Sequence, residues 1–185
     1  MIEQLKAELA ERAQAGLKRK RRLLQSPQVA HLVADGQRLL SFASNDYLGL
    51  ANHPDLISAL QHGASKAGVG GGASHLITGH HQFHHDAEQA LAGFVGLPAG
   101  LLFSTGYMAN MGVVAALLRR NDAIFADKLN HASLNDAAVL ARAELNRYAH
   151  QDLFQLEKML AASTASRKLV IVDAVFSMDG DIAPV

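Results

Sequence analysis

The chain has 185 residues, of which 49% are hydrophobic and 18% are charged, a balance that is typical of a globular protein and excludes a disordered one. Its 17 basic and 17 acidic residues cancel, so the net charge points to neither a nucleic-acid partner nor a membrane surface. The chain has no cysteine, which excludes disulfides and thiolate chemistry and is compatible with a cytoplasmic location.

Residues 1–45 are expected to form an N-terminal helix and a β-hairpin. Apolar residues recur every four positions over residues 2–22, and the basic run at 18–22 is expected to end this helix, where cations are favourable. Acidic residues in the helix argue against a signal or transit peptide, and no apolar run in the chain is long enough to span a membrane. The stretch AHLVADGQRLLSF then predicts a hairpin with Asp35 and Gly36 in its turn.

Residues 46–185 are expected to form the first part of a large α/β domain. Strand candidates lie at 99–104, 122–126, 145–149 and 169–175, and helical segments lie between them near 107–119, 131–142 and 152–162. Strands that alternate with helices of this length predict a mostly parallel sheet with helices on both faces. In such sheets the loops after the strands carry the ligand contacts.

The stretch FSTGYMAN, residues 103–110, is the first candidate site, because a strand candidate runs there directly into a helix. Free N–H groups and the positive end of the helix dipole favour a phosphate, and Gly106 would let it approach the backbone closely. A routine turn with Ser104 or Thr105 as the N-cap explains the same residues and, for this stretch taken alone, is the favoured interpretation.

Polar residues also follow two later strand candidates. His131, in ADKLNHASL, begins the next helix, where an imidazole could stack on a planar ring or move a proton, or be merely structural. Asp173 ends the most apolar strand and Ser177 follows it, either as ligand contacts or as part of an Asp-Gly turn. The strand-end groups at Gly106, His131 and Ser177 are expected to lie on one edge of the sheet.

The glycine-rich segment GVGGGASHLITGHHQFHH, residues 68–85, holds half of the chain's 10 histidines. No strand precedes its glycines, so a dinucleotide-binding fingerprint is not expected. The histidines lack the regular spacing and acidic support of a metal site, and no physiological metal is expected, although a histidine-rich metal protein stays an alternative. The glycines fit a tight loop near a ligand or another subunit.

Five stretches in order, SNDYLGLANHP, GVGGGASHLITGHHQFHHDAE, FSTGYMAN, ADKLNHASL and VFSMDGD, resemble the α-oxoamine synthases, which are fold-type I enzymes dependent on pyridoxal phosphate (PLP). The resemblance implies that Gly106 and Tyr107 hold the cofactor phosphate. It implies that His131 is the catalytic histidine, stacks on the pyridine ring and contacts the substrate, and that Ser177 reaches the phenolic oxygen. Arg19 matches the position that contacts the acyl substrate.

The activity that this resemblance implies is decarboxylative condensation of L-alanine with a pimeloyl thioester of coenzyme A or acyl-carrier protein, a step of biotin synthesis, in a homodimer with shared active sites. A sister activity of the glycine C-acetyltransferase or 5-aminolevulinate synthase type is the alternative, and so is a non-catalytic partner protein. In the family the Schiff-base lysine follows FSMDGDIAP, and Lys128, Lys158 and Lys168 match no such motif. The chain is therefore expected to be a fragment, truncated before the C-terminal domain and inactive alone.

Overall fold

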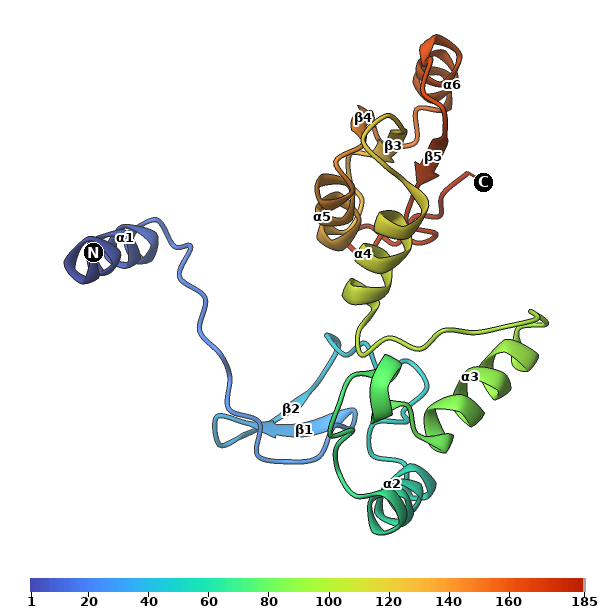
Figure 1. Cartoon of the computed structure of the whole chain (residues 1–185). Coiled ribbons are helices and arrows are strands. Elements are labelled where there is room, and N and C mark those ends of the chain that lie inside the picture. The colour runs from blue at the N-terminus through green and yellow to red at the C-terminus, as the bar shows by residue number, and fades with distance from the viewer. Residues whose placement is uncertain (185) are drawn as a thin grey trace. The chain divides into compact units, whose positions relative to one another are not determined.

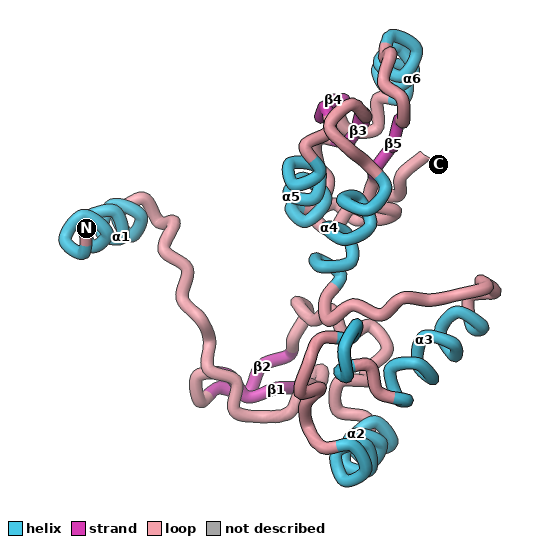
Figure 2. The backbone as a smooth tube through the Cα atoms, in the orientation of Figure 1, coloured by secondary structure: helices cyan, strands magenta, loops and turns pink. Residues whose placement is uncertain are grey.

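The computed structural model describes residues 1–184 and divides into two compact units, Met1–His81 and Gln82–Val185 (Figure 1). Long loops join the helices and strands, as the colouring by secondary structure shows (Figure 2). In this part of the chain no helix is both long and apolar enough to cross a membrane. The expected division into domains at residue 45 concerns a whole protein and stays a prediction.

The first unit begins with α1, Ile2–Gln14, which is shorter than the helix expected over residues 2–22. Gly16 follows α1 with a φ of 70°, a left-handed conformation that commonly ends helices at glycine. The basic run at 18–22 therefore lies outside the helix and does not cap it, contrary to the expectation. Like charges at this spacing would repel one another along a helix.

The expected hairpin is confirmed in the first unit. β1, His31–Ala34, pairs antiparallel with β2, Gln37–Leu40. Asp35 and Gly36 have φ values of 52° and 75°, and two successive positive φ angles are what a type I′ hairpin turn requires. The Asp35 side chain also accepts a hydrogen bond from Leu23 N at 2.9 Å, which fixes the segment that precedes β1.

Three helical elements lie where the sequence analysis expected none. α2, Pro54–Ala67, begins after His53, whose Nδ1 accepts a hydrogen bond from Asp55 N at 3.3 Å. A π-helical turn, η1, covers His75–Gly79, and α3, Gln82–Phe94, opens the second unit. Proline at the first helical position signals α2, but histidine is an unusual N-cap and conceals its start.

A parallel three-stranded sheet forms the centre of the second unit, as expected (Figure 1). β3, Ala123–Asp127, is the middle strand, and β4, Glu144–Tyr148, and β5, Lys168–Ile171, pair with it on either side. Every residue of β3 is buried, which is typical of a parallel strand covered on both faces.

Helices cover both faces of this sheet. α4, Gly106–Leu117, packs against α5, Ala132–Ala141, and both contribute to one hydrophobic core with Ile124 of β3. Phe125, the next residue of β3, points to the other face and is 1% exposed. α6, Leu153–Ala162, contacts β3 and β4. The expected sheet with two covered faces is therefore confirmed.

Residues 99–104 do not form the strand that their apolar sequence predicts. No strand among the described residues pairs with them, and Leu101 and Leu102 are 76% and 40% exposed. One hydrogen bond, from Leu102 N to Glu88 Oε1 at 2.8 Å, links the segment to α3. A strand requires a neighbour for its N–H and C=O groups, so apolar pattern alone could not produce one here.

Candidate functional site

The candidate site lies at the carboxyl end of the sheet, where the loops after β3 and β5 meet the starts of α4 and α5. The rings of Tyr107 and His131 lie edge to face, with centroids 6.4 Å apart. The carboxylate of Asp173 accepts a hydrogen bond from His131 N at 2.6 Å. The structure thus brings Tyr107, His131 and Asp173 together, and we call these three residues the strand-end site.

The start of α4 offers free backbone donors beside this site. Thr105 is the N-cap, and its Oγ1 accepts a hydrogen bond from Met108 N at 3.2 Å. Within residues 1–184 the N–H groups of Gly106 and Tyr107 donate to no protein acceptor. A Cβ built on Gly106 would meet nothing within 4 Å, so open space lies over the helix end. An anion placed there would meet two N–H groups and the positive end of the helix dipole.

His131 is held by hydrogen bonds that also fix its tautomer. Its Nδ1 accepts from Ser133 N at 3.2 Å and lies 2.7 Å from Ser133 Oγ. Asn110 Nδ2 donates to that same Oγ at 2.8 Å, so the hydroxyl hydrogen of Ser133 is directed to His131. Nδ1 is therefore an acceptor, and in the neutral ring the hydrogen lies on Nε2. Such a ring can stack on a planar group and donate a hydrogen bond.

Tyr107 connects the first turns of α4 and α5. Its hydroxyl donates a hydrogen bond to Asp136 Oδ2 on α5. Because Asp136 lies on the same helix that His131 caps, this bond holds the Tyr107 ring beside the imidazole. The resemblance of the sequence had indicated Tyr107 but not Asp136.

The side chain of Asn130, which follows β3, binds the backbone at the end of β5. Its Nδ2 donates to Ile171 O at 2.8 Å, and its Oδ1 accepts from Asp173 N at 3.1 Å. These bonds replace the strand pairing that the sequence predicted as far as residue 175, so β5 ends at Ile171 instead. They also direct the Asp173 carboxylate to His131.

Ser177 lies on a tight turn beyond the strand-end site. Val175 and Ile182 form an isolated antiparallel bridge at the base of this turn, and Phe176 N donates to Asp181 O at 2.9 Å. Ser177 is exposed, and among the described residues no recorded hydrogen bond joins it to Tyr107, His131 or Asp173. The expected contact of Ser177 with a cofactor stays a prediction.

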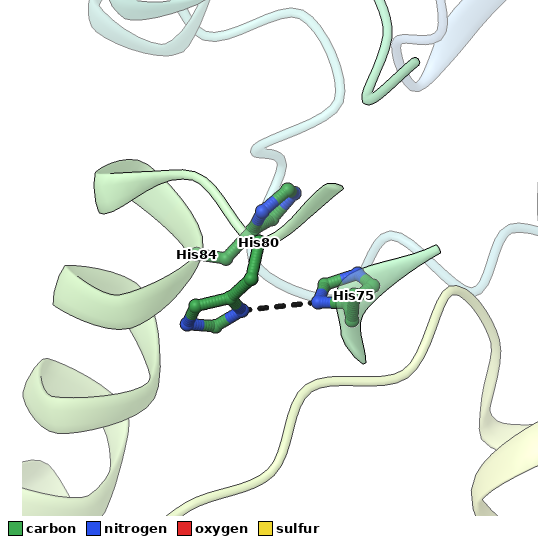
Figure 3. Close-up of side chains that lie close together, drawn as sticks. All are labelled: His75, His80 and His84. Atoms are coloured by element: carbon green, nitrogen blue, oxygen red, sulfur yellow. Dashed lines mark hydrogen bonds between the residues drawn. The ribbon is translucent and has the colours of Figure 1, made fainter. Parts of the chain in front are cut away.

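Two other predicted features belong to the first unit. Arg19 is exposed in a segment without helix or strand, and its role toward an acyl substrate stays a prediction. His75 and His80 face one another, with Nδ1 atoms 3.0 Å apart and ring centroids 5.2 Å apart (Figure 3). One of the two nitrogens donates and the other accepts. The expectation that no physiological metal binds in this segment also stays a prediction.

A buried carboxylate that was not predicted from the sequence, Asp127, lies at the end of β3. The side chain is 1% exposed and accepts hydrogen bonds from Leu129 N, Gln151 N and His150 Nδ1. Burial by itself raises the pKa of Asp127, but these hydrogen bonds outweigh it and hold the pKa below its ordinary value. An aspartate that ends a buried strand is a usable signal in the sequence, whereas nothing there indicated its pairing with His150.

The sequence matches the class I and II aminotransferase family over residues 37–185. A curated relative, the 8-amino-7-oxononanoate synthase of Methylobacillus flagellatus, is 63% identical over 185 residues, which are 100% of this chain and 47% of the relative. The chain thus spans about half the length of the curated relatives it matches.

Solved structures show the same fold. A lysine-to-alanine variant of a serine palmitoyltransferase from S. paucimobilis, with a bound PLP–myriocin aldimine, has a TM-score of 0.88 and 31% identity, over 97% of this chain and 46% of that one. An 8-amino-7-oxononanoate synthase from Francisella tularensis has a TM-score of 0.64 and 33% identity, over 77% of this chain and 39% of that one. The expected fold of the fold-type I PLP-dependent enzymes is therefore confirmed.

Proposed function

This chain belongs to the class I and II aminotransferase family, and from that premise we propose that it contributes to a PLP-dependent acyltransferase with the activity of an 8-amino-7-oxononanoate synthase. That activity joins L-alanine and a pimeloyl thioester with loss of CO2. The observation that carries the proposal is the 63% identity to such a synthase along the entire chain. The free helix end and fixed imidazole of the strand-end site agree with it.

The strand-end site, the start of α4 beside it and the turn that carries Ser177 have groups that fit PLP. The N–H groups of Gly106 and Tyr107 would hold the phosphate in the open space over α4. The imidazole of His131 would lie against the pyridine ring, and Ser177 would reach the phenolic oxygen. Bound in this way, the cofactor supplies an electron sink for the α-carbon of the amino acid.

The residues around His131 keep its ring in one orientation and one tautomer. Ser133 is fully buried and Asn110 is partly buried, so the hydrogen bonds that they direct to the imidazole are shielded from water. The hydrogen on Nε2 is left for the cofactor or the substrate. Arg19 is proposed to contact the acyl substrate, and the whole protein is proposed to act as a cytoplasmic homodimer with shared active sites.

A sister activity is the second candidate, because the serine palmitoyltransferase structure has a TM-score of 0.88. Its sequence identity of 31% is half that of the M. flagellatus synthase, and we therefore favour L-alanine and a pimeloyl thioester. Turnover by the full-length protein should be fastest with this pair. Glycine with an acetyl or succinyl thioester, and L-serine with a palmitoyl thioester, are the competing pairs, and faster turnover with any of them would reject the proposed specificity.

Cofactor binding by the 185-residue chain tests the site directly. We expect PLP to bind more tightly than pyridoxal, which lacks the phosphate, in equilibrium dialysis. Gly106→Pro removes one phosphate donor, while proline is tolerated at the first position of a helix and after the extended Thr105. This substitution should weaken PLP binding about tenfold and leave pyridoxal unchanged.

The matched substitution for that experiment is Gly106→Ala. It keeps the N–H group and places its methyl in open space, so it should lose less affinity for PLP than Gly106→Pro. Equal binding of PLP and pyridoxal by the unsubstituted chain would count against the phosphate site and hence against the proposed function.

A further inference from the structure

His150 lies between two carboxylates that come from different parts of the second unit. Its Nδ1 is 3.0 Å from Asp127 Oδ1 at the end of β3, and its Nε2 is 2.8 Å from Asp181 Oδ2. Asp181 belongs to the turn at residues 175–182. The ring of Phe176, from the same turn, packs edge-on against the imidazole with centroids 4.4 Å apart. The His150 side chain is 28% exposed.

These contacts require a charged ring. A neutral imidazole has one N–H group and can donate to one carboxylate, whereas the imidazolium donates to both. Asp127 accepts two backbone N–H groups besides His150 and is therefore held as an anion. The hydrogen bond to Asp127 raises the pKa of His150, against the opposing effect of partial burial, and Asp181 raises it further.

Asp181 depends on this cation. Its Oδ2 also accepts a hydrogen bond from Gln151 Nε2, and the same Nε2 donates to Ile182 O at 3.2 Å. Its other oxygen, Oδ1, is buried and has no hydrogen-bond partner among the described residues. Burying a carboxylate with one unpaired oxygen costs free energy unless a positive charge lies beside it.

We propose that His150 is a positioning residue, which bridges Asp127 and Asp181 and thereby fastens the turn at residues 175–182, with Ser177 on it, to the end of β3. The relevance of this turn to a cofactor rests on the proposed function, but the fastening itself is a property of the fold. The ring of His150 contacts β3's terminal carboxylate and the turn's carboxylate at once. Gln151 contacts the same two carboxylates through two separate neutral groups, its backbone N–H and its side-chain amide.

The bridge should make the turn sensitive to pH. The titratable groups around His150 are Asp127, Asp181 and, on β4, Tyr148, whose pKa is raised by burial and by the charge of Asp127. Tyr148 therefore stays neutral while His150 titrates. Once His150 loses its proton, one of its two nitrogens presents a lone pair to a carboxylate, and the turn should open more often.

Amide hydrogen exchange of the 185-residue chain tests this bridge. The amides to follow are those of Phe176, Gly180 and Ala183, whose hydrogen bonds hold the turn. After correction for intrinsic exchange, we expect their protection to be about tenfold higher near pH 6 than near pH 9, the scale of one charge-assisted hydrogen bond. In His150→Gln and Asp181→Asn the protection should be low at both pH values. The control, His62→Gln on the exposed face of α2, should match the unsubstituted chain.

Equal protection at both pH values in the unsubstituted chain, or unchanged protection in both variants, would overturn the proposal. If the variants also lose protection in α5, they have unfolded, and the decision falls to the unsubstituted chain's ring-proton titration. His150 must then titrate above the ordinary histidine pKa of about 6.5, and a lower or equal midpoint would overturn the bridge. A turn that responds as expected in a chain that binds PLP no better than pyridoxal would contradict the proposed function and leave the bridge intact.

Discussion

Ser133 determines which nitrogen of the His131 ring carries the hydrogen, because its N–H and its hydroxyl both point to Nδ1. Ser133→Ala removes the hydroxyl and leaves the backbone donor. We expect a larger fraction of His131 with its hydrogen on Nδ1, since this nitrogen loses the stronger of its two donors. The 15N chemical shifts of the ring report the change directly. Unchanged ring shifts in Ser133→Ala would show that the hydroxyl has no part in setting the tautomer.

Asp127 and His150 limit the stability of the second unit at opposite ends of the pH scale. The pKa of Asp127 is lower in the folded chain, so its stabilisation is present above its unfolded pKa of about 3.9 and is lost as the pH falls through the folded value. The pKa of His150 is raised, so its stabilisation is full below about pH 6.5 and is lost as the pH rises through the folded value. Thermal unfolding across this range should show a maximum between about pH 4 and pH 6.5.

His150→Gln should flatten the alkaline side of that profile, because glutamine has no charge to lose. The acid side should be less affected, since Asp127 keeps the N–H groups of Leu129 and Gln151. A melting temperature that keeps rising from near pH 6 to near pH 9 in the unsubstituted chain would contradict this assignment.

The sequence predicted that Gly106, His131 and Ser177 lie on one edge of the sheet. The structure places Tyr107, the residue after Gly106, against His131, whereas Ser177 lies on a turn beyond them. Position in an alternating pattern of strands and helices is local information, and it was enough to indicate Gly106 and His131. The partners that orient them were not predictable, because the bonds from Asn110 to Ser133 and from Tyr107 to Asp136 connect different helices. Such contacts arise only once α4 and α5 have packed.

The elements that were predicted well are those whose apolar pattern is satisfied within the described chain. β3, β4 and α4 to α6 lie within a few residues of their expected positions. β3, α4 and α5 bury apolar residues in one core of the same unit, and β4 packs against it through Leu145. The segment at 99–104 has the same apolar character and no partner strand, and α1 has no buried residue. Pairing between strands is not a local property, and the sequence of a segment cannot supply it.

The turn around η1 depends on a glycine that is not replaceable. A Cβ on Gly79 would lie 1.9 Å from the carbonyl oxygen of Ala73, and this oxygen belongs to the backbone, so the loop would have to move. We expect Gly79→Ala to destabilise the first unit by about 1–3 kcal/mol, the usual cost of overpacking. Gly70→Ala is the control from the same loop, since its added Cβ meets nothing within 4 Å. Unfolding in urea measures both, and equal stabilities would contradict the predicted clash.

At the scale of the whole chain, unpaired backbone and exposed apolar side chains predict self-association. Among the described residues, β4 and β5 are the edges of the sheet, and residues 99–104 have no partner strand. Segments of this kind pair with other chains unless charges protect them.

We expect the 185-residue chain to associate with rising concentration in analytical ultracentrifugation, and we expect Leu101→Lys to reduce this association by placing a charge on the segment at 99–104. Leu60→Lys is the matched control: Leu60 is 74% exposed and Leu101 is 76% exposed, but Leu60 lies on α2, whose backbone is already hydrogen-bonded. An equal effect of both substitutions would mean that general charge, and not the unpaired segment, governs association.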